Sequence, residues 1–211
     1  MVTDMMIDLE TLSTRASAVV VSLGAIVFNM RDEITNTQVI STYYEEFAIQ
    51  EQIDKGCKVD ESTIRWWMEK DIVVRKIMTD NGYRRCDVKN GLARFSVWVE
   101  RFNSEVKRIW SHGEAFDLAI LPELYAQYNV PCRLDHRKFR DTKTLFDWGK
   151  KEEYEKLLRP KGETEHHALR DAINQASAAQ FVWRNLRRIV DAEESKKKEF
   201  NAIAGMIDSE A

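Results

Sequence analysis

The order of apolar and polar positions predicts strands at the start of the chain and mostly helices after it. Residues 5–9 form a short apolar run, and residues 18–28 are rich in β-branched side chains, which is typical of buried strands. Residues 38–49 partly alternate, and the polar residues 29–37 before them are typical of a hairpin turn. We therefore expect three consecutive antiparallel strands, with Gly24 as the position of a β-bulge.

Helical periodicity dominates after residue 60. Residues 60–78 begin with acids, residues 117–128 are amphipathic and stop before Pro131, and residues 168–190 repeat apolar side chains at helical spacing. In this last helix the positions predicted to face inward are Leu169, Ile173, Ala176, Val182, Leu186 and Ile189. A second apolar stripe consists of Val88, Leu92, Phe95, Val99, Phe102 and Val106. With a further strand ending at Trp110, and residues 139–146 ambiguous, the pattern predicts an α/β domain with a mixed sheet.

Composition is typical of a globular protein, with 211 residues that are 44% hydrophobic and 32% charged. We expect one domain over residues 1–190, followed by a charged tail or helix extension over residues 191–211. Three widely spaced cysteines indicate neither a zinc cage nor a disulfide framework, which fits a cytosolic compartment. There is no apolar run of about 18 residues and no export signal, so we expect no membrane association.

The charge distribution limits the way in which the chain could hold nucleic acid. A net charge of −3 argues against a broad basic face for duplex DNA, although a strand end could still enter a pocket. Residues 133–143 carry five basic and two acidic side chains. That local excess either faces phosphates or forms a solvated loop, and the sequence leaves both open.

Two acids stand one residue apart in the apolar run MMIDLET. Because residues i and i+2 of a strand share a face, Asp8 and Glu10 would lie side by side, where both desolvation and repulsion are costly. Either this stretch is a solvated edge or a cation lies between the two carboxylates. Asp117, after the fourth strand, and Asp171, five residues beyond His166, are the acids that could join them.

Such a cluster of carboxylates points to metal-assisted hydrolysis. Oxygen ligands favour Mg²⁺ or Mn²⁺, and two ions about 3.5–4 Å apart suit attack of water on a phosphodiester. A histidine of near-neutral pKa such as His166 suits the general base. Each element alone has an ordinary explanation, since Asp117 could cap a helix and Asp171 could be a solvated acid.

Three motifs in order make the combination specific. They are MIDLETL (residues 6–12), GEAFD (residues 113–117) and HHALRDA (residues 166–172), the last matching H-x-A-x-x-D through His166, Ala168 and Asp171. Together they resemble the exonuclease motifs of the DEDD superfamily, histidine subtype. Residues 13–28 and the tandem Trp66 and Trp67 are similar to the phage exonuclease A group and its bacterial 3′-5′ exoribonuclease relatives, and the resemblance spans residues 4–187.

The resemblance implies an RNase H-like fold with a central mixed sheet, three antiparallel strands first and helices packed on it. It implies that Asp8, Glu10 and Asp171 hold one ion, that Asp8 bridges to a second, and that Asp117 completes the site. His166 would be the general base.

Motif spacing favours His166 over the adjacent His167 as that base. The second motif departs from the family pattern, because residues 112–114 are His-Gly-Glu where an asparagine is frequent. Whether His112 takes that polar role stays open.

The resemblance also suggests substrate contacts. Leu9, Thr11 and Leu12 flank the first motif, and Leu12 either stacks on the terminal base or belongs to the core. Trp66 and Trp67 differ by about 100° around a helix, so one of them could be exposed for stacking, although a core role is the more common one. Arg140 and Lys143 either meet a phosphate or pair with Asp141.

From these features we predict a metal-dependent 3′-5′ exonuclease that acts on single-stranded DNA or RNA and releases nucleoside 5′-monophosphates. The relatives imply a cytoplasmic protein of a bacterium or of a phage-infected host cell. A catalytically weak binding module and a small-nucleotide phosphodiesterase are the alternatives. All four acids and the histidine are present, which argues against the first, whereas the lack of a large basic face leaves the second open. The oligomeric state is undetermined, and a homo-oligomer stays open.

Overall fold

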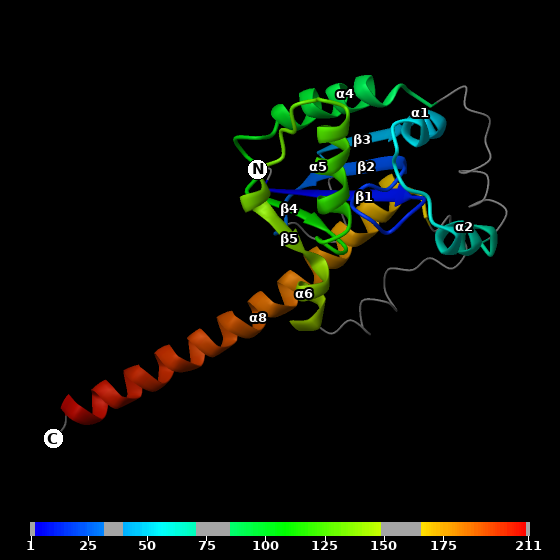
Figure 1. The fold of residues 1–211 in the computed structure, drawn as a ribbon. Helices are drawn as coiled ribbons and strands as arrows, with labels where there is room; N and C mark the ends of the chain where they lie inside the picture. The colour runs from blue at the N-terminus through cyan, green and yellow to red at the C-terminus, as the bar shows by residue number, and fades with distance from the viewer. Residues whose placement is uncertain (1–2, 32–39, 71–84, 149–165, 210–211) are drawn as a thin grey trace.

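A mixed five-stranded sheet forms the centre of the computed structural model, which describes residues 3–31, 40–70, 85–148 and 166–209, with side chains described up to residue 198 (Figure 1). The strand order is β3-β2-β1-β4-β5. β1 (Asp4–Thr11), β2 (Val20–Phe28) and β3 (Ser41–Glu46) are antiparallel neighbours, as the hydrophobic pattern predicts. β4 (Arg108–Ser111) pairs parallel with β1, and β5 (Phe139–Asp141) pairs parallel with β4.

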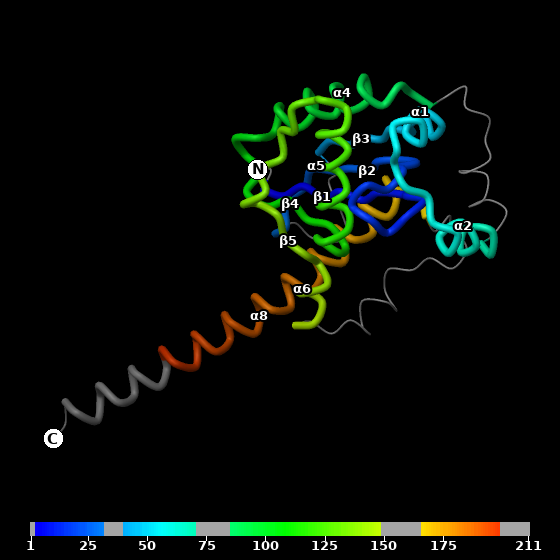
Figure 2. The backbone as a smooth tube through the Cα atoms, in the orientation of Figure 1, coloured from blue at the N-terminus to red at the C-terminus, as the bar shows by residue number. Residues whose placement is uncertain are grey.

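The helices divide between the two faces of this sheet (Figures 1 and 2). α4 (Val88–Glu100) and α5 (Asp117–Gln127) cover one face, and α8 (Ala168–Ser209) crosses the other with α6 (Thr142–Trp148) beside it. The shorter α1 (Ile49–Asp54), α2 (Glu61–Met68) and the 3-10 helix η2 (His136–Lys138) connect the strands. None of the described helices is long and apolar enough to cross a membrane.

Several predicted elements change their extent. The helix predicted over residues 60–78 ends at Met68, and residues 71–78 lie outside the described residues, as do residues 32–37 of the predicted turn. The ambiguous residues 139–146 divide into β5 and the start of α6. α8 continues in helical form to Ser209, through residues 191–209.

The alternation of side chains along β1 decides to which face of the sheet Asp8 and Glu10 point. Met5, Ile7 and Leu9 belong to the core cluster under α4 and α5, whereas Met6 belongs to the cluster under α8. Because successive side chains of a strand point to opposite faces, Asp8 and Glu10 lie on the α8 side.

Gly24 does not form the predicted β-bulge. The irregularity between β1 and β2 lies at Glu10 and Thr11, and Gly24 pairs regularly with Asp8. The physical reason for a glycine at this position is close packing, because a methyl group here would overlap the backbone of Ala168 and Leu169. The first turn of α8 thus rests directly on β2, beside the acids.

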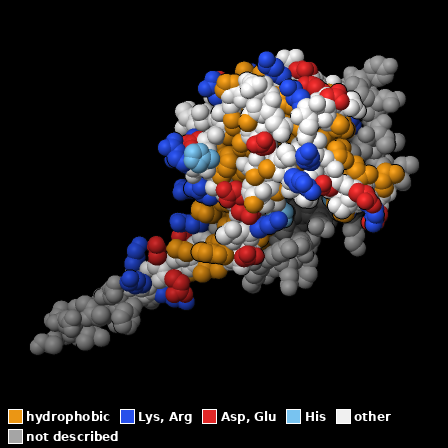
Figure 3. Space-filling view, in the orientation of Figure 1, with side chains coloured by type: hydrophobic (Ala, Val, Ile, Leu, Met, Phe, Trp, Pro, Cys, Tyr) orange, Lys and Arg blue, Asp and Glu red, His pale blue; other side chains and the backbone are white. Residues whose placement is uncertain are grey.

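The far end of α8 corrects a second prediction. Ile189 was predicted to face inward, but its side chain is 61% exposed, and that of Val190 is 45% exposed. At this point α8 has passed the edge of the sheet and projects away from it (Figure 2). Val190 and Trp148, which is 76% exposed, line one groove. Hydrophobic side chains gather on the surface where α8 leaves the domain (Figure 3).

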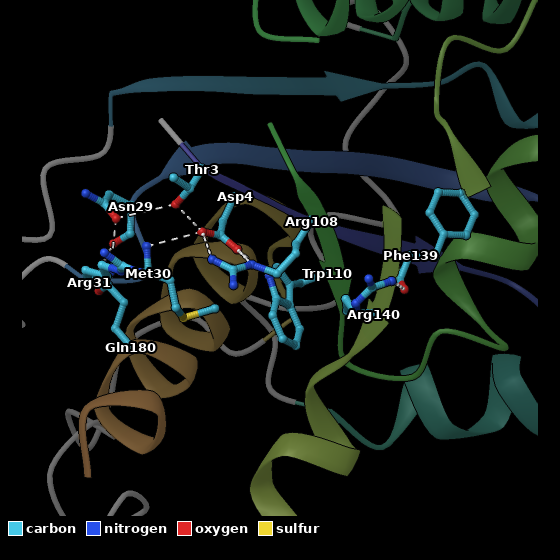
Figure 4. Close-up of polar contacts among 10 residues, drawn as sticks. All are labelled: Thr3, Asp4, Asn29, Met30, Arg31, Arg108, Trp110, Phe139, Arg140 and Gln180. Atoms are coloured by element: carbon cyan, nitrogen blue, oxygen red, sulfur yellow. Dashed lines mark hydrogen bonds and ion pairs between the residues drawn. The ribbon is translucent and has the colours of Figure 1, made fainter. Parts of the chain in front are cut away.

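A buried ion pair anchors the other end of β1 (Figure 4). The fully buried Asp4 carboxylate accepts hydrogen bonds from Arg108 Nε at 2.6 Å, Arg108 Nη2 at 2.9 Å, Trp110 Nε1 at 2.8 Å and the Met30 amide at 3.3 Å. Buried charges are tolerated when they are paired and hydrogen-bonded in this way. The network joins β1 to β4 and to the end of β2, which fixes the strand that carries the acids.

Candidate active site

The catalytic candidates of the first and third motifs meet where β1 passes beneath the start of α8. Ligand atoms of Glu10, His166 and Asp171 all lie within 4.8 Å of one another, a spacing that suits a shared metal ion. Glu10 is buried, whereas His166 and Asp171 are partly exposed. Asp8, two residues before Glu10 on the same face of β1, is also buried, although it is not part of this closest group.

Asp117 joins the cluster from the opposite face of the sheet. It is the first residue of α5 and is buried, and its Oδ1 accepts a hydrogen bond from the Leu9 backbone amide at 3.0 Å. The sequence left open that Asp117 merely caps its own helix, but Phe116 occupies the N-cap position. Asp117 therefore reaches the first motif through the strand backbone between Asp8 and Glu10.

The electrostatics of the acids are unfavourable without a cation. Burial raises the pKa of Asp8 well above its ordinary value, and the charges of Asp117, Glu10 and Asp171 raise it further. Burial raises the pKa of Glu10 well above its ordinary value too, and the charges of Asp171 and Asp117 raise it further. Burial raises the pKa of Asp117 to about 7, although the Leu9 amide and Lys143 act in the opposite direction. Since carboxylate oxygens are hard ligands, this donor set fits a divalent cation, which would offset the repulsion.

The two adjacent histidines separate in space. His166 has a φ of 66°, in the left-handed region that few non-glycine residues adopt. Its ring lies edge-on to Trp66 at 4.6 Å between centroids and to Trp67 at 5.8 Å. His167 instead stacks on Tyr44 with centroids 4.4 Å apart, and burial lowers the pKa of its imidazole. The geometry therefore favours His166 as the histidine of the site.

A pocket of about 380 Å³ opens beside Glu10. Its walls consist of Leu9, Glu10, Thr11, Thr14, Ser62, Thr63, Trp66, Trp67 and Phe116. The tandem tryptophans divide as their helical spacing predicts, since Trp66 is 40% exposed and Trp67 only 2%. Trp67 donates from Nε1 to the Thr11 carbonyl at 2.9 Å, which holds α2 against the end of β1. Trp66 is thus the more exposed tryptophan of the pocket, with the Lys70 ammonium over its ring at 4.1 Å from the centroid.

The other residues of the first motif divide between the core and the pocket. Leu12 belongs to the buried core and does not line the pocket, which leaves the core alternative of the sequence analysis. Thr11 lines the pocket, yet its hydroxyl group donates to the Ser13 carbonyl at 2.8 Å. Leu9 contributes its backbone amide to Asp117 as well as an apolar wall.

The two basic candidates, Lys143 and Arg140, lie at different places in the structure. A methyl group at Gly113 would lie 3.2 Å from Lys143 Nζ, and this ammonium group is one of the charges that act on Asp117, so Lys143 lies beside the site. Arg140 instead donates from Nη1 to the backbone carbonyls of Arg137 at 3.1 Å and Phe139 at 2.6 Å. It lines a different, mostly apolar groove of about 570 Å³ between β5, α6 and α8.

His112 is exposed, and its contacts are to α6. Its Nδ1 lies 3.0 Å from Thr142 Oγ1, and its ring is 5.7 Å from that of Phe146. It thus packs at the end of β4, next to the loop that leads to Asp117.

Comparison with known proteins places the chain in a family. A family model described as the Rv2179c-like 3′-5′ exoribonuclease domain matches residues 3–183. The chain belongs to this family. This membership confirms the resemblance to 3′-5′ exoribonucleases that the three motifs predicted, and a divalent metal at the acids is implied by such a family.

A curated relative of this chain is also named as an exonuclease. The exodeoxyribonuclease of Enterobacteria phage T4 is 28% identical over 127 residues, which are 57% of this chain and 55% of the phage enzyme. The chain thus spans about half the length of the curated relative that it matches.

Solved structures confirm the RNase H-like fold. The nuclease domain of 3′hExo, a DEDDh family member whose structure was solved bound to rAMP, superposes with a TM-score of 0.58 at 12% identity, over 86% of this chain and 92% of that one. The RNase domain of the yeast Pop2 protein superposes with a TM-score of 0.52 at 12% identity, over 87% and 77%.

The sequence analysis missed the roles of three residues at or beside the site. Phe116 lines the pocket, Gly24 admits the first turn of α8, and Gln175 donates a hydrogen bond to Asp8. Gln175 had a detectable signal, because it lies four residues after Asp171 and so on the same helix face. The role of Gly24 had none, since only packing shows it.

Proposed function

We propose that this chain is a 3′-5′ exonuclease that removes nucleotides from single-stranded DNA or RNA ends and releases nucleoside 5′-monophosphates. The observation that carries the proposal is the meeting of Glu10, His166 and Asp171 within 4.8 Å, next to the buried Asp8 and Asp117. The family assignment supports the reaction class.

Two Mg²⁺ or Mn²⁺ ions are proposed to bind to these acids. Glu10 and Asp171 would hold one ion together with Asp8, and Asp8 would extend to the second, with Asp117 completing the site directly or through water. When bound, the ions would activate the attacking water and stabilise the charge of the leaving oxygen. The protein contributes a rigid arrangement. Asp4 anchors the far end of β1 through its ion pair with Arg108, and Gln175 of α8 donates a hydrogen bond to Asp8.

His166 is proposed to accept the proton of the attacking water. It contacts both the acids and the ring of Trp66, and so lies at the boundary between metal site and pocket. Attack on the phosphorus breaks its bond to the 3′ oxygen of the preceding nucleotide. That oxygen takes a proton from solvent and becomes the new 3′ end, and the released nucleotide keeps the 5′-phosphate.

The terminal base is proposed to occupy the pocket beside Trp66. The aromatic residues Trp66 and Phe116 line this pocket, and stacking of a base on such a ring contributes about 1–3 kcal/mol. Leu9 and Thr11 would form the wall next to the acids, and Lys143 would meet the phosphate. No substrate contact is assigned to Trp67, whose side chain is buried, or to Leu12, His112 and Arg140, which do not line the pocket.

The sugar preference is open to direct test, since the family model describes an exoribonuclease whereas the phage T4 relative is named an exodeoxyribonuclease. Matched 5′-labelled single strands of DNA and RNA would be incubated with Mg²⁺, Mn²⁺ or EDTA, alongside Asp8→Ala. We expect a ladder that shortens from the 3′ end and is absent both in EDTA and with Asp8→Ala. Undiminished hydrolysis by Asp8→Ala, or intact strands of both kinds with wild type and metal, would refute the proposal.

A further inference from the structure

We infer that Gln175 is a positioning residue that holds the Asp8 carboxylate in the orientation needed to bind a divalent cation. Gln175 lies on α8, one helical turn beyond Asp171, on the face that covers β1. Its Nε2 donates a hydrogen bond to Asp8 Oδ1 at 2.6 Å. The inference rests on the proposed function only in requiring that the acids bind a divalent ion.

The chemistry of the contact fixes the orientation of the amide. In the ionised form that binds a cation, the Asp8 carboxylate only accepts hydrogen bonds, so the NH₂ group of Gln175 faces it. The carbonyl Oε1 is then the amide atom that is buried without a hydrogen-bond partner among the described residues. A buried unpaired carbonyl destabilises the fold.

Asp8 needs such a donor because the charged groups around it repel its carboxylate. Glu10, Asp117 and Asp171 all act on Asp8 as like charges. Within the described part of the chain, the hydrogen bond from Gln175 is the one recorded to the Asp8 carboxylate. It fixes Oδ1 and leaves Oδ2 for a cation. A neutral amide does this without adding a positive charge that would compete with the ion.

The same helix offers a matched control in Gln180. It is buried, it donates from Nε2 to the Asn29 carbonyl at 2.8 Å, and its Oε1 is likewise buried without a recorded partner (Figure 4). Its acceptor is a backbone group beside the Asp4 network, away from the acids. Gln175 and Gln180 thus make similar contacts, and they differ in whether the acceptor is a proposed metal ligand.

The test compares Gln175→Met with Gln180→Met in the full chain by calorimetric titration with Mn²⁺ and by thermal unfolding in EDTA. Loss of an outer hydrogen bond to a metal ligand typically weakens metal binding by about 10–100-fold, which is the change expected for Gln175→Met. Its melting temperature in EDTA should stay the same or rise, because the buried carbonyl is removed as well. Gln180→Met should bind Mn²⁺ like wild type.

Three outcomes would overturn the inference: wild-type affinity in Gln175→Met, equal weakening in Gln180→Met, or a wild-type protein that binds no Mn²⁺. Gln175→Ala, which keeps a good helix former at this position, provides the same affinity measurement should the methionine variant not fold. Hydrolysis is scored separately. A wild-type protein that binds Mn²⁺ but leaves all strands intact would refute the nuclease proposal and leave the role of Gln175 standing.

Discussion

Asp117→Asn should stabilise the metal-free protein at neutral and alkaline pH. Asparagine keeps an oxygen that can accept the hydrogen bond of the Leu9 amide, so the substitution removes the charge while retaining the contact. The pKa of Asp117 is raised from 3.8 to about 7. The folded chain therefore holds this proton more tightly than the unfolded chain does, and the free energy of unfolding must fall as the pH rises from about 4 to 7.

The shift of about three pKa units, at 1.36 kcal/mol each, corresponds to an upper limit of about 4 kcal/mol at pH 8. For a chain of this size that is a rise of about 8–16 °C in melting temperature. Removing the charge also relieves Asp8, whose pKa Asp117 helps to raise.

The measurement is thermal unfolding followed by circular dichroism in EDTA between pH 5 and pH 8.5. Asp147→Asn, at an exposed position of α6, changes the net charge equally and serves as the control. The difference in melting temperature between Asp117→Asn and wild type should widen with pH and then level off above about pH 7. Mg²⁺ should narrow the gap by stabilising wild type more. A gap that does not change with pH, or a variant less stable than wild type at pH 8 in EDTA, would contradict the electrostatic argument.

Three further predictions address the neighbouring groups. His166→Ala should reduce hydrolysis by about 10²–10⁴-fold while calorimetry still shows wild-type Mn²⁺ affinity; a matching loss of affinity would instead make His166 a metal ligand. Trp66→Ala should raise KM for a single strand by about 5- to 150-fold at nearly constant kcat, as expected for about 1–3 kcal/mol of stacking, and an unchanged KM would exclude the base pocket. Gly24→Ala should destabilise the fold by about 1–3 kcal/mol in denaturant unfolding and weaken Mn²⁺ binding, because its methyl group displaces the first turn of α8; unaltered Mn²⁺ binding would separate that turn from the site.

Local periodicity in the sequence was sufficient for much of the fold. The three opening strands and the strand before residue 112 follow from runs of β-branched and apolar side chains, and the period of two along β1 placed Asp8 and Glu10 on one face. The helical period likewise indicated that Trp66 and Trp67 point in different directions, and the structure decided that Trp66 is the exposed one. These are properties of neighbouring residues within one element, and such neighbours are related by fixed backbone geometry.

Contacts between distant elements were decided by the tertiary structure alone. Pairing of β1 with β4 brought Asp117 to the Leu9 amide, and the crossing of α8 set Gln175 against Asp8. The same crossing explains the glycine at position 24 and the exposure of Ile189, which continues the apolar pattern of α8 beyond the edge of the sheet. Periodicity fixes the direction of a side chain relative to its own helix or strand. What that side chain meets depends on how closely two elements pack and on where the surface between them ends.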